Sequence, residues 1–326
     1  DDYYAWTSFF TCIGRKHGSE AREYITFILD DPQPAKSPVD GQPVPARFLG
    51  GDVADLSDTD ALAAIADWLT ATDNRLFREN LANRIWAHLF GVGIVDPVDD
   101  IRVFNPPSNA PLLAELGRRL AEDHQYDQRA LFRDICLSRT YQASAATNDS
   151  NRLDTKNFSH ALLRRLRADV LFDAIFQALG IENRVDRMDA KSAVELYAGG
   201  RAARGELGYF LSSFGQAKRA TVCVCEDVTE TTLGQALHLM NGDELNKLIR
   251  RPDAPLVSGL LDEHGTDAQA IVEGIFVQIL SRRPTATEAA ELNRQAARLT
   301  TPEDRRRLYD DVVWALLNSS EFLFNH

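Results

Sequence analysis

The chain has 326 residues, of which 44% are hydrophobic and 26% are charged, and it carries a net charge of −12. This length and composition suit one large globular domain or two closely packed ones. The acidic balance excludes the basic footprint that nucleic-acid binding needs and disfavours an anionic membrane surface, so we expect neither partner. The sequence has no apolar run of the roughly 18–20 residues that a membrane span requires.

The first 50 residues are predicted to be the tail of a preceding region followed by an arm rich in proline and glycine. The chain opens with Asp1-Asp2-Tyr3-Tyr4, without an initiator methionine or a secretory signal, and therefore resembles an internal or mature part of a longer protein. The aromatic run 2–13 predicts a helix ended by Gly14. Residues 31–51 hold five prolines and three glycines, which indicates a linker or an extended arm lying on a surface.

From Ser57 onward the spacing of apolar residues predicts helices. Ser57 or Asp58 is expected to cap the first one. The second is expected to open at Asp73-Asn74 and to end at Gly91, where a loop over 91–107 begins. Further helix caps are predicted at Ser108, Asp127, Thr266, Thr285 and Thr301.

The middle of the chain alternates between loop and helix. Residues 143–157 are polar and rich in asparagine, which predicts a loop, and residues 158–179 predict a long helix closed by Gly180. Arg164, Arg165 and Arg167 would lie on that helix, either as an ion-pair face or as a clamp for an oxyanion or carboxylate.

Residues 181–229 are the least helical part of the sequence. The run ATVCVCEDV is the best strand candidate, and on it Cys223 and Cys225 would share a face. We therefore predict a mainly α fold, a multi-helix orthogonal array with an irregular, partly extended insertion near 181–229. The helical domain is expected to cover 51–326, as one body or as two packed lobes (51–180 and 230–326) connected by 181–229.

Several motifs follow one another in a familiar order: NRIWAHLFGVGIVDPVDD, NPPSN, SRTYQASA, RRLRADVLFDAI, CVCE, QALHLMNG and ALLNSSEFLF. With these motifs the chain, from about residue 45 to its end, resembles a planctomycete-type C-terminal domain of unknown function, the Planctomycete Specific Domain family. One departure is Asp227, which follows CVCE where the family commonly has a basic residue.

The resemblance implies a context for the chain and no specific chemistry. In that family the domain follows a cytochrome-c-like domain and a second domain of unknown function in secreted proteins. It thus implies export to the periplasm, envelope or extracellular space. It also implies haem c in a neighbouring domain and no cofactor within this chain. The expected partners are other domains of the same polypeptide, and a saccharide or another protein.

One loop gathers the candidate catalytic residues. Asp99 and Asp100 follow a helix on which Arg84 and His88 share a face. A histidine paired with a carboxylate can act as a general base, and two carboxylates can cleave a glycosidic bond. Alternatively, the aspartates cap backbone amides and pair with arginine, and the histidine is structural. The carboxylates considered for an acid and base pair are Asp96, Asp99, Asp100 and Glu115.

Two groups are candidate metal ligands. Asp96, Asp99 and Asp100 could collect a hard cation such as calcium, although their spacing matches no EF-hand loop. Cys223 and Cys225 could share a metal with a histidine, form a disulfide or remain free thiols.

The sequence lacks the nucleophile elbow, the P-loop and the dinucleotide-binding glycine motif, which argues against the corresponding enzyme classes. We expect an accessory or interaction module of a secreted, cytochrome-associated multidomain protein, with polysaccharide use as one setting. The alternatives are an enzyme acting on a polysaccharide through the carboxylate, histidine and arginine site, and a metal-stabilised structural domain. An enzyme requires these residues to line an open pocket, whereas a module requires them to be buried and hydrogen-bonded.

Overall fold

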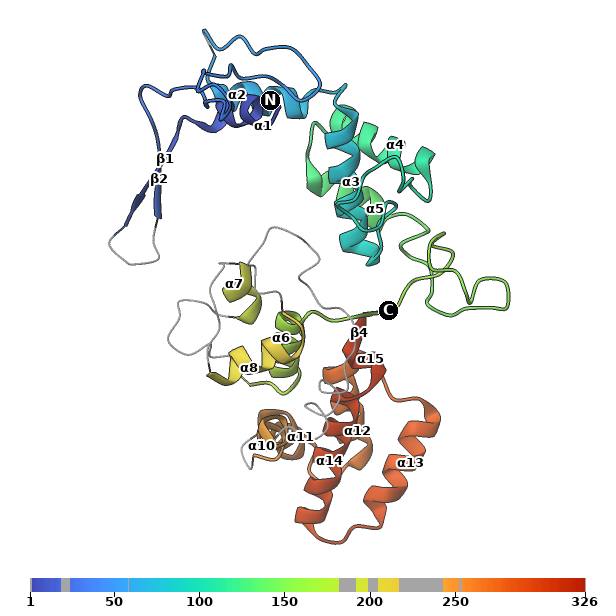
Figure 1. Cartoon of the computed structure of the whole chain (residues 1–326). Coiled ribbons are helices and arrows are strands. Elements are labelled where there is room, and N and C mark those ends of the chain that lie inside the picture. Colours follow the sequence, from blue (N-terminus) through green and yellow to red (C-terminus); the bar gives the residue numbers. More distant parts are fainter. Residues whose placement is uncertain are drawn as a thin grey trace. The chain divides into compact units, whose positions relative to one another are not determined.

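The computed structural model describes residues 2–18, 24–57, 59–181, 192–198, 205–216, 243–251 and 254–325. They form two compact units, Asp1–Gln142 and Ala143–His326. The described part of the chain is mainly helical and contains two small two-stranded sheets (Figure 1), which confirms the predicted mainly α fold. The unit boundary lies where the polar stretch 143–157 begins. The second unit includes residues 143–180, which the sequence analysis grouped with the first lobe.

The first unit opens with helix α1 (Asp2–Thr7), the 3-10 turn η1 (Ser8–Phe10) and an antiparallel hairpin of β1 (Ile13–His17) and β2 (Tyr24–Ile28). The prediction of a single helix over 2–13 was therefore wrong beyond Phe10, and Gly14 lies within a strand. A Cβ atom at Gly14 would lie 2.7 Å from ring atoms of Phe27, so a larger residue here would have to displace that exposed ring.

The proline-rich segment lies on a small aromatic core. Phe9, Ala46 and Ile65 are buried together, and Phe48 stacks on Trp68 with ring centroids 5.6 Å apart. The segment is thus a docked, extended arm, which was one of the two predicted alternatives. Helix α2 (Ala61–Thr70) follows it and is capped by Asp60, not by Ser57 or Asp58 as predicted.

The loop that the sequence singled out joins two of the remaining helices of the first unit. Helix α3 (Arg75–Phe90) begins after its cap Asn74 and ends at Gly91, whose φ is +80°, as predicted. Helix α4 (Ala110–Arg118) is capped by Asn109, so the prediction of Ser108 was wrong by one residue. A π-helical turn, η2 (Arg119–Asp123), and helix α5 (Gln128–Cys136), capped by Asp127, complete the unit.

A short sheet in the second unit joins a segment near its beginning to the end of the chain. Strand β3 (Arg164–Arg165) pairs with β4 (Phe324–Asn325), so helix α6 (Ala168–Ala178) begins ten residues later than predicted. The arginine cluster is therefore not on one helical face. Arg165 donates to the carbonyl of Phe214 at 2.9 Å, and Arg167 pairs with the buried Asp169 at 2.5 Å.

Two short helices are described inside the stretch that was predicted to be irregular, α7 (Ala193–Ala198) and α8 (Gly205–Ser213). The predicted strand with Cys223 and Cys225 lies outside the described residues. The C-terminal helices are α10 (Asp243–Ile249), α11 (Pro255–His264), α12 (Ala268–Leu280), α13 (Ala286–Ala297), α14 (Pro302–Leu317) and α15 (Ser320–Leu323).

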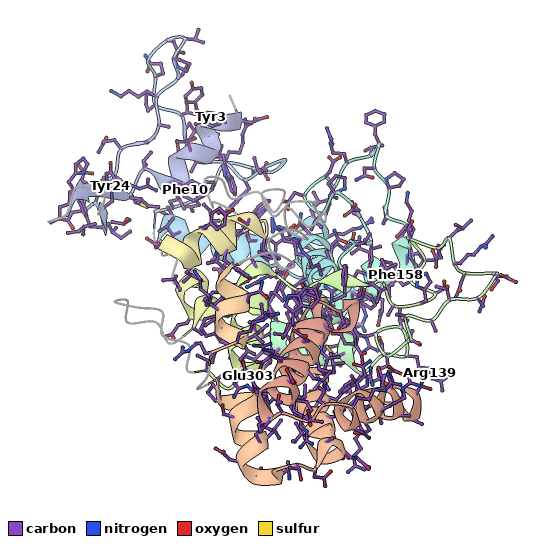
Figure 2. All side chains as sticks on the ribbon, turned by 90° about the horizontal axis from the view of Figure 1, so that it is seen from below. Tyr3, Phe10, Tyr24, Arg139, Phe158 and Glu303 are labelled. Atoms are coloured by element: carbon purple, nitrogen blue, oxygen red, sulfur yellow. The ribbon has the colours of Figure 1, made fainter. Side chains whose placement is uncertain are left out.

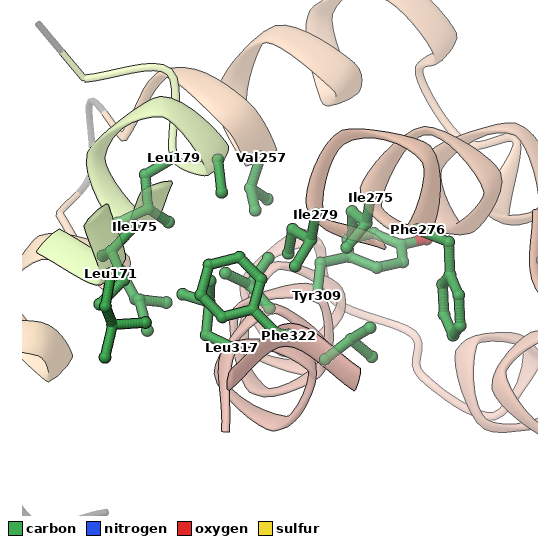
Figure 3. Close-up of a cluster of buried hydrophobic side chains, with 14 of the residues drawn as sticks. Leu171, Ile175, Leu179, Val257, Ile275, Phe276, Ile279, Tyr309, Leu317 and Phe322 are labelled. Atoms are coloured by element: carbon green, nitrogen blue, oxygen red, sulfur yellow. The ribbon is translucent and has the colours of Figure 1, made fainter. Parts of the chain in front are cut away.

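Apolar side chains from α6, α11, α12, α14 and α15 form the main core of the second unit (Figure 3). The predicted caps Thr285, with its capping box, and Thr301 are confirmed, whereas α12 is capped by Asp267 in place of Thr266. Among the described residues, no helix is both long enough and apolar enough to cross a membrane.

Candidate functional site

The base of the loop between α3 and α4 is built around one buried amide. Asn83 on α3 has no exposed surface. Its Nδ2 donates to the carbonyl of Val95 at 2.9 Å, and its Oδ1 accepts the amide of Val95 at 3.0 Å. A side-chain amide thus replaces the backbone partner that a loop segment lacks, and the backbone of the buried Val95 is fixed to α3.

Gly93 is required by the same arrangement. A Cβ atom at this position would lie 2.2 Å from the carbonyl oxygen of Val95 and 3.1 Å from Oδ1 of Asn83. Because the clashing oxygen belongs to the backbone, no side-chain movement would relieve the contact. The glycine therefore allows the chain to fold back against Asn83.

The far end of the loop is tied to its beginning. The amide and hydroxyl of Ser108 both donate to the carbonyl of Ile94, at 2.8 and 3.0 Å. Nδ2 of Asn105 donates to the carbonyls of Asp96 and Asp100 at 3.2 and 3.0 Å. The motif Asn-Pro-Pro-Ser thus closes the loop through its two polar members.

The carboxylates of Asp99 and Asp100 each form an ion pair with a different arginine. Arg84 pairs with Asp99 at 2.5 Å, and Arg102 pairs with Asp100. The Arg102 guanidinium holds the pKa of the Asp100 carboxyl below its usual range, because it hydrogen-bonds the ionised form. A general acid for glycoside cleavage needs the opposite shift. All four side chains are at least partly exposed to solvent. Water therefore screens the two ion pairs, and each contributes little to the stability of the loop.

The other predicted site residues are placed elsewhere. His88 is exposed, and its ring lies edge-on to Phe132 of α5 with centroids 6.0 Å apart. Asp96 is exposed at the start of the loop, and its backbone carbonyl accepts a hydrogen bond from Nδ2 of Asn105. The structure thus brings Arg84 to Asp99, and places His88 against a different helix.

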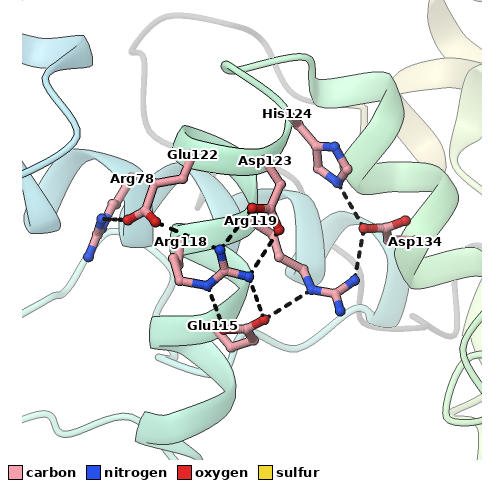
Figure 4. A network of polar contacts seen from close by, with 8 residues as sticks. All are labelled: Arg78, Glu115, Arg118, Arg119, Glu122, Asp123, His124 and Asp134. Carbon is pink, nitrogen blue, oxygen red and sulfur yellow. Dashed lines mark hydrogen bonds and ion pairs between the residues drawn. The ribbon is translucent and has the colours of Figure 1, made fainter.

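Glu115 belongs to a separate polar network on α4, η2 and α5 (Figure 4). It accepts two hydrogen bonds from Arg118, both at 2.9 Å, and one from Arg119 at 3.1 Å. These arginines lower the pKa of Glu115 to about 2, so it is ionised at neutral pH and suits no general-acid role. Its spacing of three and four residues from the arginines was the sequence signal for this pairing.

The same network contains a histidine–aspartate contact that the sequence analysis did not identify. Nε2 of His124 lies 2.8 Å from Oδ2 of Asp134, and Arg119 lies 3.2 Å from the same oxygen. His124 and Arg119 lower the pKa of the Asp134 carboxyl. Residues that are ten apart in sequence show no spacing signal, and here one follows the π-helical turn while the other lies on α5.

The tip of the loop carries two apolar residues that sequence reasoning overlooked. The amide of Asn105 donates to the carbonyl of Arg102 at 2.9 Å, which closes a four-residue turn with Val103 and Phe104 at its central positions. These side chains are 93% and 97% exposed. Two adjacent apolar residues within a charged and proline-rich loop were the available signal, because turn positions normally hold polar residues or glycine.

In the part of the chain that is described, no three His, Cys, Asp or Glu side chains lie together as a metal-binding group. Cys223 and Cys225 fall outside those residues. Metal binding at either predicted place therefore stays a prediction.

The chain is a mainly helical domain of two units, in which a hydrogen-bonded loop follows the long helix α3. Among protein families, the one described as PSD1, protein of unknown function (DUF1553), matches residues 63–296. The chain belongs to this family. No curated protein and no solved structure matches the chain. The match covers the loop and most of the second unit, and the hairpin β1–β2 precedes it.

Proposed function

We propose that the chain is a docking module that inserts Val103 and Phe104 into an apolar pocket of a folded partner protein. The observation that carries the proposal is the nearly complete exposure of both side chains on a loop with a fixed base. Isolated apolar residues on a surface are ordinary, but two adjacent ones at the centre of a closed turn form a protruding anchor.

The energetics favour such an anchor. Complete burial of a phenylalanine or valine side chain is worth about 1.5–3 kcal/mol each. A loop that is held in its bound conformation loses little entropy on binding, and Asn83, Asn105 and Ser108 provide this order before any partner arrives. The ion pairs of Asp99 and Asp100 would then form the polar rim around the anchor.

The setting of the module is inferred from the sequence resemblance alone. The resemblance supports an exported polypeptide in which a haem-c domain and a second domain precede this one. Those two domains would be its nearest partners. Fractionation of the source cells, with mass spectrometry of peptides from residues 75–142, would test export. Recovery of these peptides only from the cytoplasm would contradict it.

The docking proposal is tested by a photoreactive phenylalanine analogue at position 104 of the full-length protein in its source cells. Leu153, which is 85% exposed in the other unit, is the matched control position. We expect one discrete cross-linked protein from position 104 and none from 153. Excess wild-type chain should compete with it, and excess Phe104→Ser chain should not.

Other outcomes would overturn this assignment. Equal competition by the Phe104→Ser chain would show that the tip is not the anchor. Retention of the wild-type chain on a polysaccharide matrix, with loss of retention in Phe104→Ser, would assign the tip to a saccharide. Polysaccharide cleavage that is abolished in a folded Asp100→Asn variant would replace the docking role with the enzymatic alternative.

A further inference from the structure

We infer that the hairpin β1–β2 pairs with the same hairpin of a second copy of this chain, edge to edge along β2. The inference starts from exposure. All five residues of β2 are exposed, among them Phe27 by 40% and Tyr24 by 59%, although the strand contains no charged residue. Tyr24 is labelled in Figure 2. An uncharged strand without proline at a sheet edge is a template for pairing with another strand. A two-stranded hairpin is moreover only marginally stable by itself in water.

The two edges of the hairpin differ in a way that selects β2. Strand β1 carries Arg15, Lys16 and His17 in succession. Two antiparallel copies of β1 centred on Arg15 would place the arginines directly opposite each other, which is destabilising. Strand β2 has no such barrier, because its central residue is Thr26 and its neighbours are apolar.

The backbone pattern shows which residues offer hydrogen bonds at the free edge. The register pairs Ile13 with Ile28, and the amide of Leu29 donates to the carbonyl of Cys12 at 2.8 Å. Residues 12 and 29 are therefore a hydrogen-bonded pair, and so are 14 with 27 and 16 with 25, because such pairs alternate along an antiparallel ladder. The backbone groups of Tyr24, Thr26 and Ile28 consequently point away from β1.

Strand β2 is complementary to itself in this register. With a two-fold axis at Thr26, the outward-pointing groups form hydrogen-bonded pairs between the two Thr26 residues and between Tyr24 and Ile28. Ile25 then faces Phe27 of the other copy at the closer, non-hydrogen-bonded positions. Threonine pairs and pairs of an aromatic with a β-branched residue are among the favourable cross-strand combinations. The product is a four-stranded sheet with a two-fold axis at its centre, and two-fold dimers are the commonest soluble oligomers.

Sedimentation velocity of the whole chain over the micromolar range tests the pairing. We expect a concentration-dependent dimer for the wild type. Thr26→Lys should abolish it in that range, because two ammonium groups would meet at the symmetry axis. Arg15→Lys is the control on the other strand: it keeps the charge that disfavours pairing along β1, so it should leave the dimer unchanged. Circular dichroism establishes that each variant is folded.

A second measurement does not depend on the lysine variant. Thr26→Cys, oxidised under mild conditions, should form a dimer linked through the peptide that contains residue 26, whereas Lys16→Cys, which keeps Arg15, should not. A wild type that stays monomeric, a Thr26→Lys chain that dimerises as the wild type does, or equal cross-linking from positions 16 and 26 would each overturn the inference. These outcomes are independent of Phe104, so they do not bear on the docking proposal.

Discussion

The base and the tip of the loop between α3 and α4 differ in almost every physical respect. At the base, Asn83 and Gly93 are buried, and the polar groups around them are satisfied. At the tip, Val103 and Phe104 are almost fully exposed, and the preceding residues Asp99 and Asp100 form partly exposed ion pairs. The difference indicates a division of roles, in which the base determines the conformation and the tip is available for contact. Substitutions at the two places should therefore affect different measurements.

The largest effect is expected from Asn83→Ala. It would leave the buried amide and carbonyl of Val95 without partners, and each such loss costs about 1–3 kcal/mol. We expect the free energy of unfolding of the first unit to fall by about 3 kcal/mol in urea titration. Asn109→Ala, which removes the cap of α4, is the control and should cost about 1 kcal/mol. Equal effects of the two substitutions would show that Asn83 has no special role.

Gly93→Ala should have the next largest effect. The added methyl group would meet the Val95 carbonyl, and overpacking of this kind costs about 1–3 kcal/mol. Gly259→Ala in α11 is the matched control, since a Cβ atom there meets nothing within 4 Å. It should raise stability by up to about 1 kcal/mol through helix propensity. A neutral Gly93→Ala would contradict the close approach at the base.

Substitutions at the tip should barely change stability. Asp100→Asn breaks an exposed ion pair and should cost less than about 0.5 kcal/mol. The sequence analysis expected a module to have this aspartate buried and hydrogen-bonded, whereas it lies in a partly exposed ion pair. Phe104→Ser should likewise stay within about 0.5 kcal/mol of the wild type while losing partner cross-linking. A large loss of stability in Phe104→Ser would remove the distinction between base and tip.

The smallest effect concerns pH. Arg118 and Arg119 lower the pKa of Glu115 from 4.5 to about 2 in the folded chain. A lowered folded-state pKa stabilises the fold above pH 4.5, and this contribution is lost as the pH falls from 4.5 toward 2. Glu115→Gln should therefore lower stability slightly at pH 7 and not at pH 2, in urea titrations at both values. A variant that loses equal stability at both pH values would show that the effect is not electrostatic.

The sequence was sufficient for features that depend on local chemistry. The caps at Asn74 and Asp127, the capping box at Thr285 and the helix stop at Gly91 follow from preferences that act within one helical turn. The mainly α class followed from apolar periodicity over many residues. The docked arm was predicted as one alternative, because Phe48 near its end indicated packing.

Features that depend on distant partners were missed. The helix predicted from 158 starts at 168, because Arg164 and Arg165 pair with the end of the chain, some 160 residues away. Strand β2 gave too short a signal to be separated from the polar segment around it. At the loop, the pairing of aspartates with arginine was one of the predicted alternatives, and the structure shows it for Asp99 and Asp100. The sequence did not reveal that Asn83 is the central residue or that Phe104 is presented to solvent.

Amide hydrogen exchange of the whole chain tests the contrast between base and tip most directly. The amide of Val95 is buried and bonded to Asn83, so it should exchange only when the first unit unfolds. The amides of Val103 and Phe104 should exchange at rates close to those of an unstructured peptide. Exchange of Val95 as fast as that of Phe104 would contradict a fixed base that presents an exposed anchor.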